Sequence, residues 1–349
     1  MKSSNIGGQA VLEGIMMRHK QDVAVAVRKP DGEIEVGKTR FKSITTKNKF
    51  LGLPIVRGFV AFIESLVMGI KTLTFSASFY EDDIENESGA TDRSLDSVFK
   101  SKSEAAAMGI TIIVSLCISL ALFILAPYAI SQAIVKYSNI TSTALLALIE
   151  GVIKLLIFLL YLYFISRMKD IKRTFMYHGS EHKCINCIET GHDLTVENVM
   201  KASKEHRRCG TSFLFIVLFI SIIFFIFIRV DAYWLRLIIR ILLIPIISGV
   251  SFEVIQWSGR SESKFAYILS RPGMWFQRLT TKEPTEDMCE VAIKAVEAVF
   301  DWKAYLAQEF GRIYETPSEE KENISETEKE IEEVNEIEAE EAPLEEGAQ

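Results

Sequence analysis

The chain has 349 residues, of which 49% are hydrophobic, and its formal net charge is −7 at pH 7. Residues 318–349 carry 14 acidic residues and two lysines, a net charge of −12, so the rest of the chain is about +5. The basic residues lie beside apolar runs and are not interleaved with aromatic residues, which predicts membrane lipids and no nucleic acid as partners. Residues 316–349 are predicted to be a disordered acidic tail.

Residues 1–79 are predicted to form a cytosolic N-terminal region. The stretch GGQAVLEGIMMR contains Gly7, Gly8 and Gly14, which indicates tight turns or close approach of the backbone to another element. From residue 22 to residue 37 the sequence alternates as VAVAVR, turns at Pro-Asp-Gly and resumes as EIEVG. This pattern predicts a β-hairpin.

Residues 51–79 carry apolar side chains at helical spacing, but Arg57, Glu64 and Lys71 interrupt any spanning run. We expect an amphipathic helix that lies on the membrane or packs under a helix bundle. A buried helix of a small cytosolic domain remains an alternative. Residues 80–104 are charged, small and without a period, and are predicted to be a flexible linker.

The central part of the chain is predicted to span a membrane. The run between Glu104 and Lys136 holds 31 residues without a charge, and the run between Arg208 and Arg229 holds 20. A hydrocarbon core needs roughly 20 residues in a helix. The sequence therefore predicts a mainly α-helical, polytopic bundle within residues 105–257. Its four transmembrane helices are expected at about 105–135, 144–166, 209–228 and 232–257.

The sequence does not decide the role of the charged residues inside these helices. Glu150 and Lys154 stand one turn apart, so they either face the bundle interior or snorkel to the headgroups. Pro127 is expected to kink or end the first helix. Nine basic residues lie in the segment 167–208, against Lys136 alone in the first short loop. The positive-inside rule therefore predicts a cell-membrane protein with this segment and both termini in the cytosol.

Residues 258–315 are predicted to form a cytosolic C-terminal segment. A Pro-Gly turn is expected at residues 272–273, followed by Trp275 and Phe276 as anchors at the headgroup level. A helix with one apolar face is expected to begin near Thr285.

The segment 167–208, with Cys209 at its edge, concentrates the potential metal ligands: four of the five histidines and three of the five cysteines. His178, Glu181 and His182 form an H-x-x-E-H pattern. On a helix the two imidazoles share one face, an arrangement that binds Zn²⁺, and the glutamate is placed to act as general base. Supplementary ligands nearby are Cys187, Glu189, His192, His206 and Cys209.

Three interpretations of this segment remain open. In one, His178 and His182 hold a catalytic metal with an open position. In another, a closed structural tetrahedron resembles a zinc ribbon and uses Cys184, Cys187, His206 and Cys209. In the third there is no metal, the histidines bind carbonyls or lipid phosphates, and the cysteines act as small hydrophobic residues. No P-loop, dinucleotide fingerprint or nucleophile elbow is present in the sequence.

Four stretches together resemble the YqhQ family: GGQAVLEGIMMR, HGSEHK, EHRRCGTSFLF and MWFQRLTTKEPTEDMCEVAIKAV. This bacterial family of unknown function is labelled as a predicted metal-dependent membrane enzyme. The resemblance runs from about Ile6 to about Phe300. It implies that Glu181 is catalytic and that His178 and His182 bind the metal, completed by Cys187, His206 or Cys209. Cys184 and Arg207 depart from the family pattern, which weakens the zinc-ribbon alternative.

The sequence thus favours a zinc-dependent hydrolase at the cytosolic membrane surface, acting on a membrane protein or a lipid. Glu13 is expected to approach the same site. The main alternative is a non-enzymatic membrane scaffold or assembly factor with a structural metal site. A transporter that uses Glu150, Lys154 and Glu253 is less favoured, because no internal repeat is visible.

Overall fold

The computed structural model describes most of the chain up to Tyr314. The described residues are 2–46, 48–80, 102–138, 142–228, 230, 232–261 and 263–314. Most of the predicted linker and the whole predicted acidic tail lie outside them. Residues Met1–Trp302 form one compact unit, and Lys303–Gln349 form a second. The short helix α11 (Trp302–Phe310) begins at the division. All that follows concerns the first unit.

The N-terminal region folds into a four-stranded antiparallel sheet in the order β1-β2-β3-β4. The predicted hairpin is confirmed as β3 (Asp22–Arg28) and β4 (Ile34–Arg40), with Gly32 at φ 89° in the turn. The glycine-containing stretch before it forms a second hairpin, β1 (Ile6–Val11) and β2 (Gly14–His19), which the sequence analysis did not predict.

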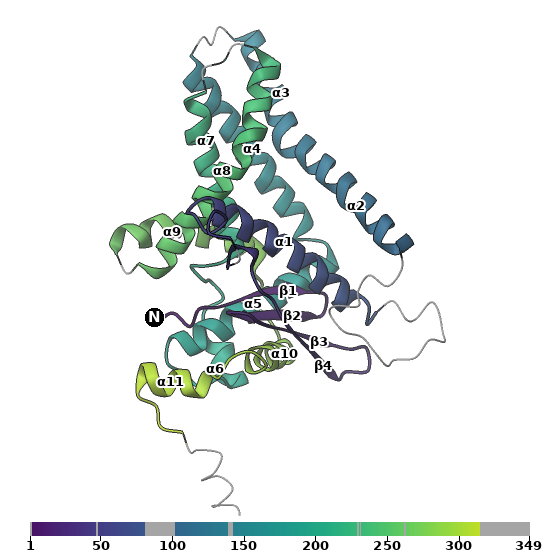
Figure 1. The fold of residues 1–349 in the computed structure, drawn as a ribbon, viewed down its shortest axis with the longest axis vertical. Helices are drawn as coiled ribbons and strands as arrows, with labels where there is room; N and C mark the ends of the chain where they lie inside the picture. The colour runs from purple at the N-terminus through teal and green to yellow at the C-terminus, as the bar shows by residue number, and fades with distance from the viewer. Residues whose placement is uncertain are drawn as a thin grey trace, which may run out of the picture. The chain divides into compact units, whose positions relative to one another are not determined.

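Helices cover both faces of this sheet. Side chains alternate along β2, so Ile15 and Met17 point to one face and Met16 to the other. The first face packs against α5 (Lys169–Glu189) and α10 (Glu286–Glu297), the second against α1 (Val56–Ala77). Figure 1 shows α1 between the sheet and the lower end of the bundle.

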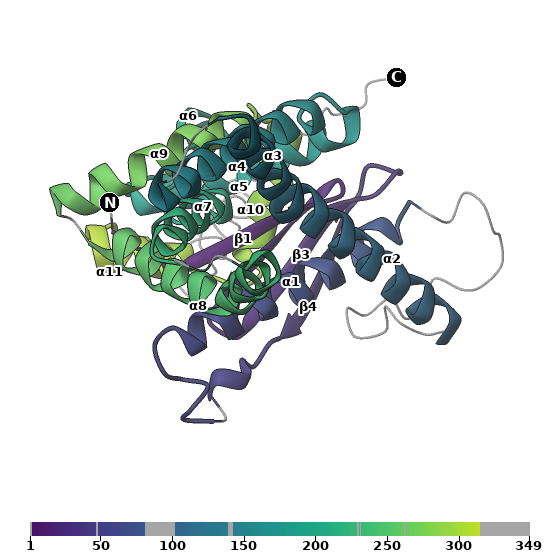
Figure 2. The same cartoon turned by 90° about the horizontal axis from the view of Figure 1, so that it is seen from above.

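In the part of the chain that the structure describes, the helix bundle is built from one long interrupted helix and three further helices. A long apolar helix is built from α2 (Lys102–Leu120), a π-helical segment η2 (Ala121–Leu125) and α3 (Ala126–Tyr137). The π segment directly precedes Pro127, where the ring disrupts regular hydrogen bonding. It is followed by α4 (Thr143–Ile165), α7 (Gly210–Ile226) and α8 (Tyr233–Arg260). Seen from above, α7 lies between α4 and α8 (Figure 2).

Within the described residues, four helices are long and apolar enough to cross a membrane: Val56–Ala77, Gly109–Tyr137, Leu145–Ile165 and Trp234–Gly259. Their outer faces expose large apolar side chains, such as Ile113 (62% exposed), Leu156 (59%) and Leu242 (68%). Apolar surface on this scale is not stable against water but is stable against lipid. The fold is that of a membrane protein.

The set of four differs from the predicted set in one member. The predicted third span is α7, an apolar helix of 17 residues, whereas α1 has the length and hydropathy of a span. However, α1 packs Met68 and Phe75 on the sheet and brings Gly58 against the backbone of Gly249 in α8. Its Glu64 is buried and accepts hydrogen bonds from the hydroxyl of Ser43 and the amide of Ile44. These contacts are those of a helix packed under the bundle.

Helix α9 (Lys264–Thr280) corrects the prediction for residues 272–273, because it continues through Pro272 and Gly273 without a turn. Gly273 lets α9 approach α7, since an added Cβ would lie 2.8 Å from the Cβ of Ser212. Phe276 is 3% exposed and packs in the bundle, so of the two predicted anchors only Trp275 (54%) is exposed. Helix α10 begins after Thr285, as predicted.

Candidate metal centre

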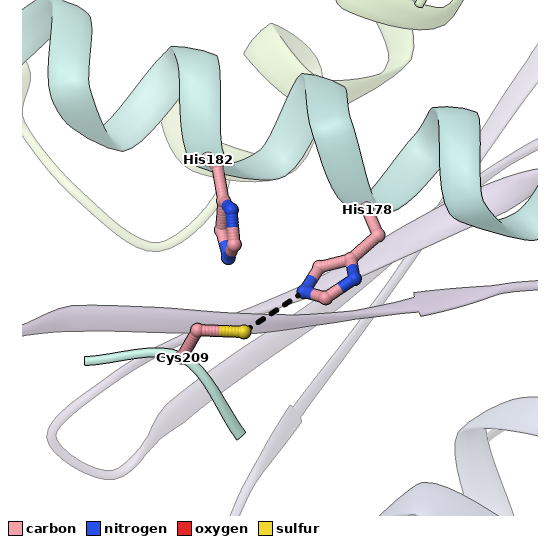
Figure 3. Close-up of side chains that lie close together, drawn as sticks. All are labelled: His178, His182 and Cys209. Carbon is pink, nitrogen blue, oxygen red and sulfur yellow. Dashed lines mark hydrogen bonds between the residues drawn. The ribbon is translucent and has the colours of Figure 1, made fainter. Parts of the chain in front are cut away.

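Most of the predicted ligand segment is helical, and α5 carries both motif histidines on one face. Their ring centroids are 4.4 Å apart. Cys209 is the N-cap residue of α7, and its Sγ lies 3.2 Å from Nε2 of His178. Figure 3 shows the two rings pointing toward this sulfur. One ligand atom from each of the three residues lies within 4.8 Å of the others.

Backbone carbonyls fix the orientation of both rings. Nδ1 of His178 is 2.9 Å from the carbonyl oxygen of Thr280, and Nδ1 of His182 is 2.7 Å from that of Lys204. A carbonyl only accepts, so each Nδ1 carries a proton, and Nε2 is the ring nitrogen that remains for a metal. Metal-binding histidines are characteristically held in this way.

The three ligand atoms suit zinc. Zinc bond lengths imply separations of about 3.3–3.6 Å between nitrogen and sulfur ligands of a tetrahedron. The observed separations, up to 4.8 Å, require small side-chain movements. A cavity of about 80 Å³ is lined by all three residues, which would leave room for a further ligand. With a metal bound, two imidazoles and one thiolate would supply the three protein ligands that catalytic zinc sites have in common.

Cys209 and His178 form a thiolate–imidazolium pair, so a metal bound here would displace the proton on Nε2 of His178. Burial raises the pKa of Cys209, but His178 and His182 lower it more, and the net pKa is well below the usual value for a thiol. Burial lowers the pKa of His178, but Cys209 and Glu181 outweigh it and raise the pKa to about 9. Cys209 is therefore a thiolate, the form that binds metals.

Glu181 lies beside the centre. Its Oε2 is 4.0 Å from Nε2 of His178, and the side chain lines the 80 Å³ cavity. Gly8 of β1 makes this possible, because a Cβ there would lie 2.9 Å from Cγ of Glu181. The close backbone approach predicted from the paired glycines is confirmed at Gly8.

His206 lies in the wall of the cavity but outside the group of three. Its ring centroid is 5.7 Å from that of His182, and its Nε2 is 3.6 Å from Glu189. Gln277 of α9 fixes the backbone of His206: it accepts from the amide nitrogen at 2.8 Å and donates to the carbonyl at 2.6 Å. Gln277 is fully buried, and the sequence analysis missed it. The sequence signal that could have identified it is a single amide side chain in the aromatic-rich stretch Trp275-Phe276-Gln277.

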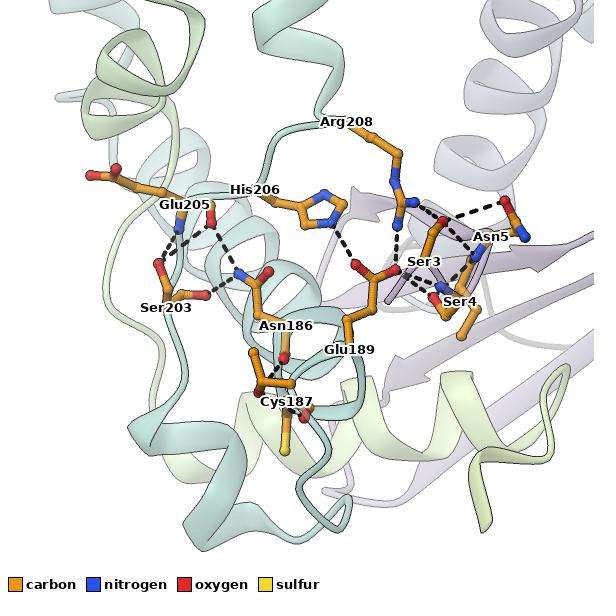
Figure 4. Close-up of polar contacts among 12 residues, drawn as sticks. Ser3, Ser4, Asn5, Asn186, Cys187, Glu189, Ser203, Glu205, His206 and Arg208 are labelled. Atoms are coloured by element: carbon orange, nitrogen blue, oxygen red, sulfur yellow. Dashed lines mark hydrogen bonds and ion pairs between the residues drawn. The ribbon is translucent and has the colours of Figure 1, made fainter. Parts of the chain in front are cut away.

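Two of the cysteines are not brought to the centre. Sγ of Cys187 lies 3.4 Å from the carbonyl oxygen of Asp193, and burial raises its pKa to about 12. Figure 4 shows this side chain pointing away from His206. Cys184 is in the hydrophobic core, where burial raises its pKa well above the usual value. Both are neutral thiols, and the described residues do not assemble the zinc-ribbon set.

The other acidic residues named from sequence also lie elsewhere. Glu13 pairs with Arg173, and its carboxylate accepts from the hydroxyl of Tyr177 at 3.3 Å, so it does not join the metal centre. Glu253 of α8 pairs with Arg57 of α1 at 2.7 Å. Glu150 faces the bundle interior and pairs with Arg240 of α8, rather than with Lys154.

Glu189 links Ser4, near the N-terminus, to His206 and Arg208 beside the candidate metal centre. Its carboxylate accepts from the amide and hydroxyl of Ser4, both at 2.8 Å, and pairs with Arg208 (Figure 4). Burial raises the pKa of Glu189, but His206 and Arg208 lower it more, to about 2.

We expect acid to remove the stabilisation given by Glu189. Because the folded pKa is depressed, the stabilisation is complete above the unfolded value of 4.5 and is lost as pH falls toward 2. The pKa difference corresponds to about 3 kcal/mol. Melting temperatures of the protein and of Glu189→Gln, measured between neutral pH and pH 3, should converge on acidification. Parallel curves would contradict this role.

The fold is a helical membrane bundle on a small sheet, and a cluster of two histidines and one cysteine lies where α5 meets the start of α7. The family model described as "Protein of unknown function (DUF1385)" matches residues 53–302. The chain is also 36% identical over 304 residues to "Uncharacterized protein YqhQ" of Bacillus subtilis (strain 168), covering 86% of this chain and 94% of that protein. It belongs to the YqhQ family. No solved structure matches it.

Proposed function

We propose that this protein is a metal-dependent hydrolase whose zinc ion is held by His178, His182 and Cys209. The observation that carries the proposal is the pair of Nδ1-to-carbonyl hydrogen bonds, which present both Nε2 atoms beside a buried thiolate. If the histidines served only to form hydrogen bonds to carbonyls, their Nε2 atoms would not need to converge on a cysteine. In metal sites, the same Nδ1-to-carbonyl hydrogen bonds hold the histidine ligands in place.

Glu181 acts as the general base in this proposal. It lines the small cavity next to the three ligands, where a water molecule has room. A zinc ion bound there supplies Lewis-acid polarisation of the scissile carbonyl or phosphoryl group. Glu181 takes one proton from the water molecule while the water oxygen forms a bond to the substrate. When the scissile bond breaks, Glu181 delivers that proton to the leaving group.

We place the site at the cytosolic surface of the cell membrane. The centre lies between the C-terminal end of α4 and the first residue of α7, so it is near the end of the membrane helices. The nine basic residues of segment 167–208 support a cytosolic position under the positive-inside rule.

The metal content of purified protein tests the proposal. We expect about one zinc per chain in the native protein and almost none in His178→Ala/His182→Ala, because two of three ligands are lost. His192→Ala is the matched control: this histidine follows α5 but bonds Thr190 at 3.0 Å and is outside the centre. Elemental analysis by mass spectrometry gives the measurement. Equal zinc in all three proteins, or none in any, would refute the metal site.

Glu181→Gln separates a hydrolase from a scaffold with a structural metal. The amide keeps the shape of the side chain but cannot accept the proton. A hydrolase is expected to retain zinc and lose the ability to complement a deletion strain, whereas a scaffold would retain both.

A further inference from the structure

A cavity of about 900 Å³ connects the candidate metal centre to the membrane helices. His178 and Glu181 line one part of it. Phe158 and Leu162 of α4 and Leu214 of α7 line another. From Phe158 to Ile165 the lining follows the last two turns of α4, a length of about 10 Å. The cavity is therefore polar at the centre and apolar along the bundle.

Basic side chains surround the polar part. Arg18, Lys20 and Arg208 line the cavity. The acidic residues Glu64 and Glu181 also line it. The carboxylate of Glu64 accepts from the hydroxyl of Ser43 at 3.1 Å and from the amide of Ile44 at 2.7 Å. Arg208 shares its charge with Glu189. The cavity lining thus carries three basic side chains (Arg18, Lys20 and Arg208) against two carboxylates (Glu64 and Glu181), an excess of one positive charge that favours an anion.

A second cavity, of about 530 Å³, lies beside the first between α1, α7 and α8. The two share Arg208, Leu214 and Phe252 in their walls, and Cys209 lines the second. Leu66 and Leu73 of α1, each 49% exposed, also line the second cavity. Apolar surface thus continues from the metal centre to the outside of the helices.

We propose that the larger cavity binds an anionic membrane lipid as the substrate of the site, with its headgroup near Arg18 and Lys20 and its acyl chain along α4. That the lipid is a substrate rests on the proposed hydrolase function. That the cavity binds the lipid does not depend on it. Its volume lies in the range of small-ligand sites. Two residues of the apolar wall, Tyr161 of α4 (41% exposed) and Leu214 of α7 (43%), are also exposed at the outside of the helices, so an acyl chain can enter from the bilayer.

Photo-crosslinking in nanodiscs tests the binding. The full-length protein is reconstituted with phosphatidylcholine and a small fraction of diazirine-labelled lipid, either phosphatidylglycerol or phosphatidylcholine. Crosslinked peptides are then mapped by mass spectrometry. We expect the anionic probe to label the cavity residues of α4 and α7 about tenfold more than the neutral probe, as one charge-assisted contact provides.

Four variants locate the labelling. Leu214→Trp and Ser65→Trp, which fill the two cavities, should each abolish cavity labelling, and Ser65 is exposed, so its replacement leaves the core intact. Leu242→Trp is the matched control on a lipid-facing position of α8 that is 68% exposed. Arg18→Gln should reduce the headgroup preference.

Equal labelling by both probes, or labelling that persists in both filling variants, would overturn the proposal. Preferential capture of a membrane peptide in the cavity would overturn it in favour of a protein substrate. Crosslinking is also measured on His178→Ala/His182→Ala. Cavity labelling that survives without zinc supports lipid binding independently of the metal, whereas zinc without cavity labelling supports the hydrolase and refutes the lipid.

Discussion

Arg240→Met is expected to lower the free energy of unfolding by about 3–5 kcal/mol, because it leaves Glu150 charged and buried inside the bundle. Nη1 of Arg240 lies 2.5 Å from Oε1 of Glu150, and both side chains are at most 7% exposed. The guanidinium also stacks over the ring of Phe225 at 4.8 Å. Denaturant or thermal unfolding in detergent measures the loss.

Two further variants test that reason. Glu150→Gln/Arg240→Met removes both charges and should recover most of the lost stability, since neither charge is left unpaired. Arg236→Met, one turn earlier on α8, is the matched control: Arg236 donates to the carbonyl of Val230 at 2.9 Å and should cost far less. If the double variant is as unstable as Arg240→Met, the ion pair is not the cause.

Gly179→Ala is expected to disrupt the metal centre without touching a ligand. A Cβ at this position on α5 would lie 2.0 Å from the carbonyl oxygen of Lys282, whose amide donates to Phe175 at 2.9 Å. The chain after α9 must therefore move away from α5, and the carbonyl of Thr280 that orients His178 moves with it. We expect a loss of about 3 kcal/mol together with most of the bound zinc.

Gly210→Ala is the matched control for this substitution. Gly210 adjoins Cys209 directly, but an added Cβ would meet nothing within 4 Å. At the first position of α7, alanine also favours the helix. Stability and zinc content should both be unchanged. Normal zinc content in Gly179→Ala would show that the Thr280 carbonyl does not position the metal ligand.

The intramembrane pair shows where local reasoning fails. Spacing places Lys154 one turn from Glu150, yet the buried carboxylate pairs with Arg240, 90 residues away in sequence. Lys154 instead lies over the ring of Phe225 at 5.2 Å. Helical spacing states which residues share a face, but a rigid guanidinium from another helix competes for the same carboxylate, and only packing decides between them.

The sequence by itself determined the features that depend on short segments. Run length predicted the long helix built from α2, η2 and α3 because the bilayer has a fixed thickness. The second charge-free run became α7, an apolar helix of only 17 residues. The Pro-Asp-Gly turn predicted the β3–β4 hairpin, and the i, i+4 spacing placed His178 and His182 on one face. The β1–β2 hairpin was missed because both faces of β2 are buried, so its apolar residues do not alternate with polar ones.

The tertiary structure alone decided which of the candidate ligands lies beside His178 and His182. Cys187, His206 and Cys209 were equal candidates, since all lie within thirty residues of the motif. Cys187 stands on α5 with its thiol at backbone carbonyls away from the centre, and His206 is held by Gln277 and Glu189. Cys209 reaches the two histidines because the start of α7 packs against α5 and α9. Ligand choice depends on that docking, which no local spacing encodes.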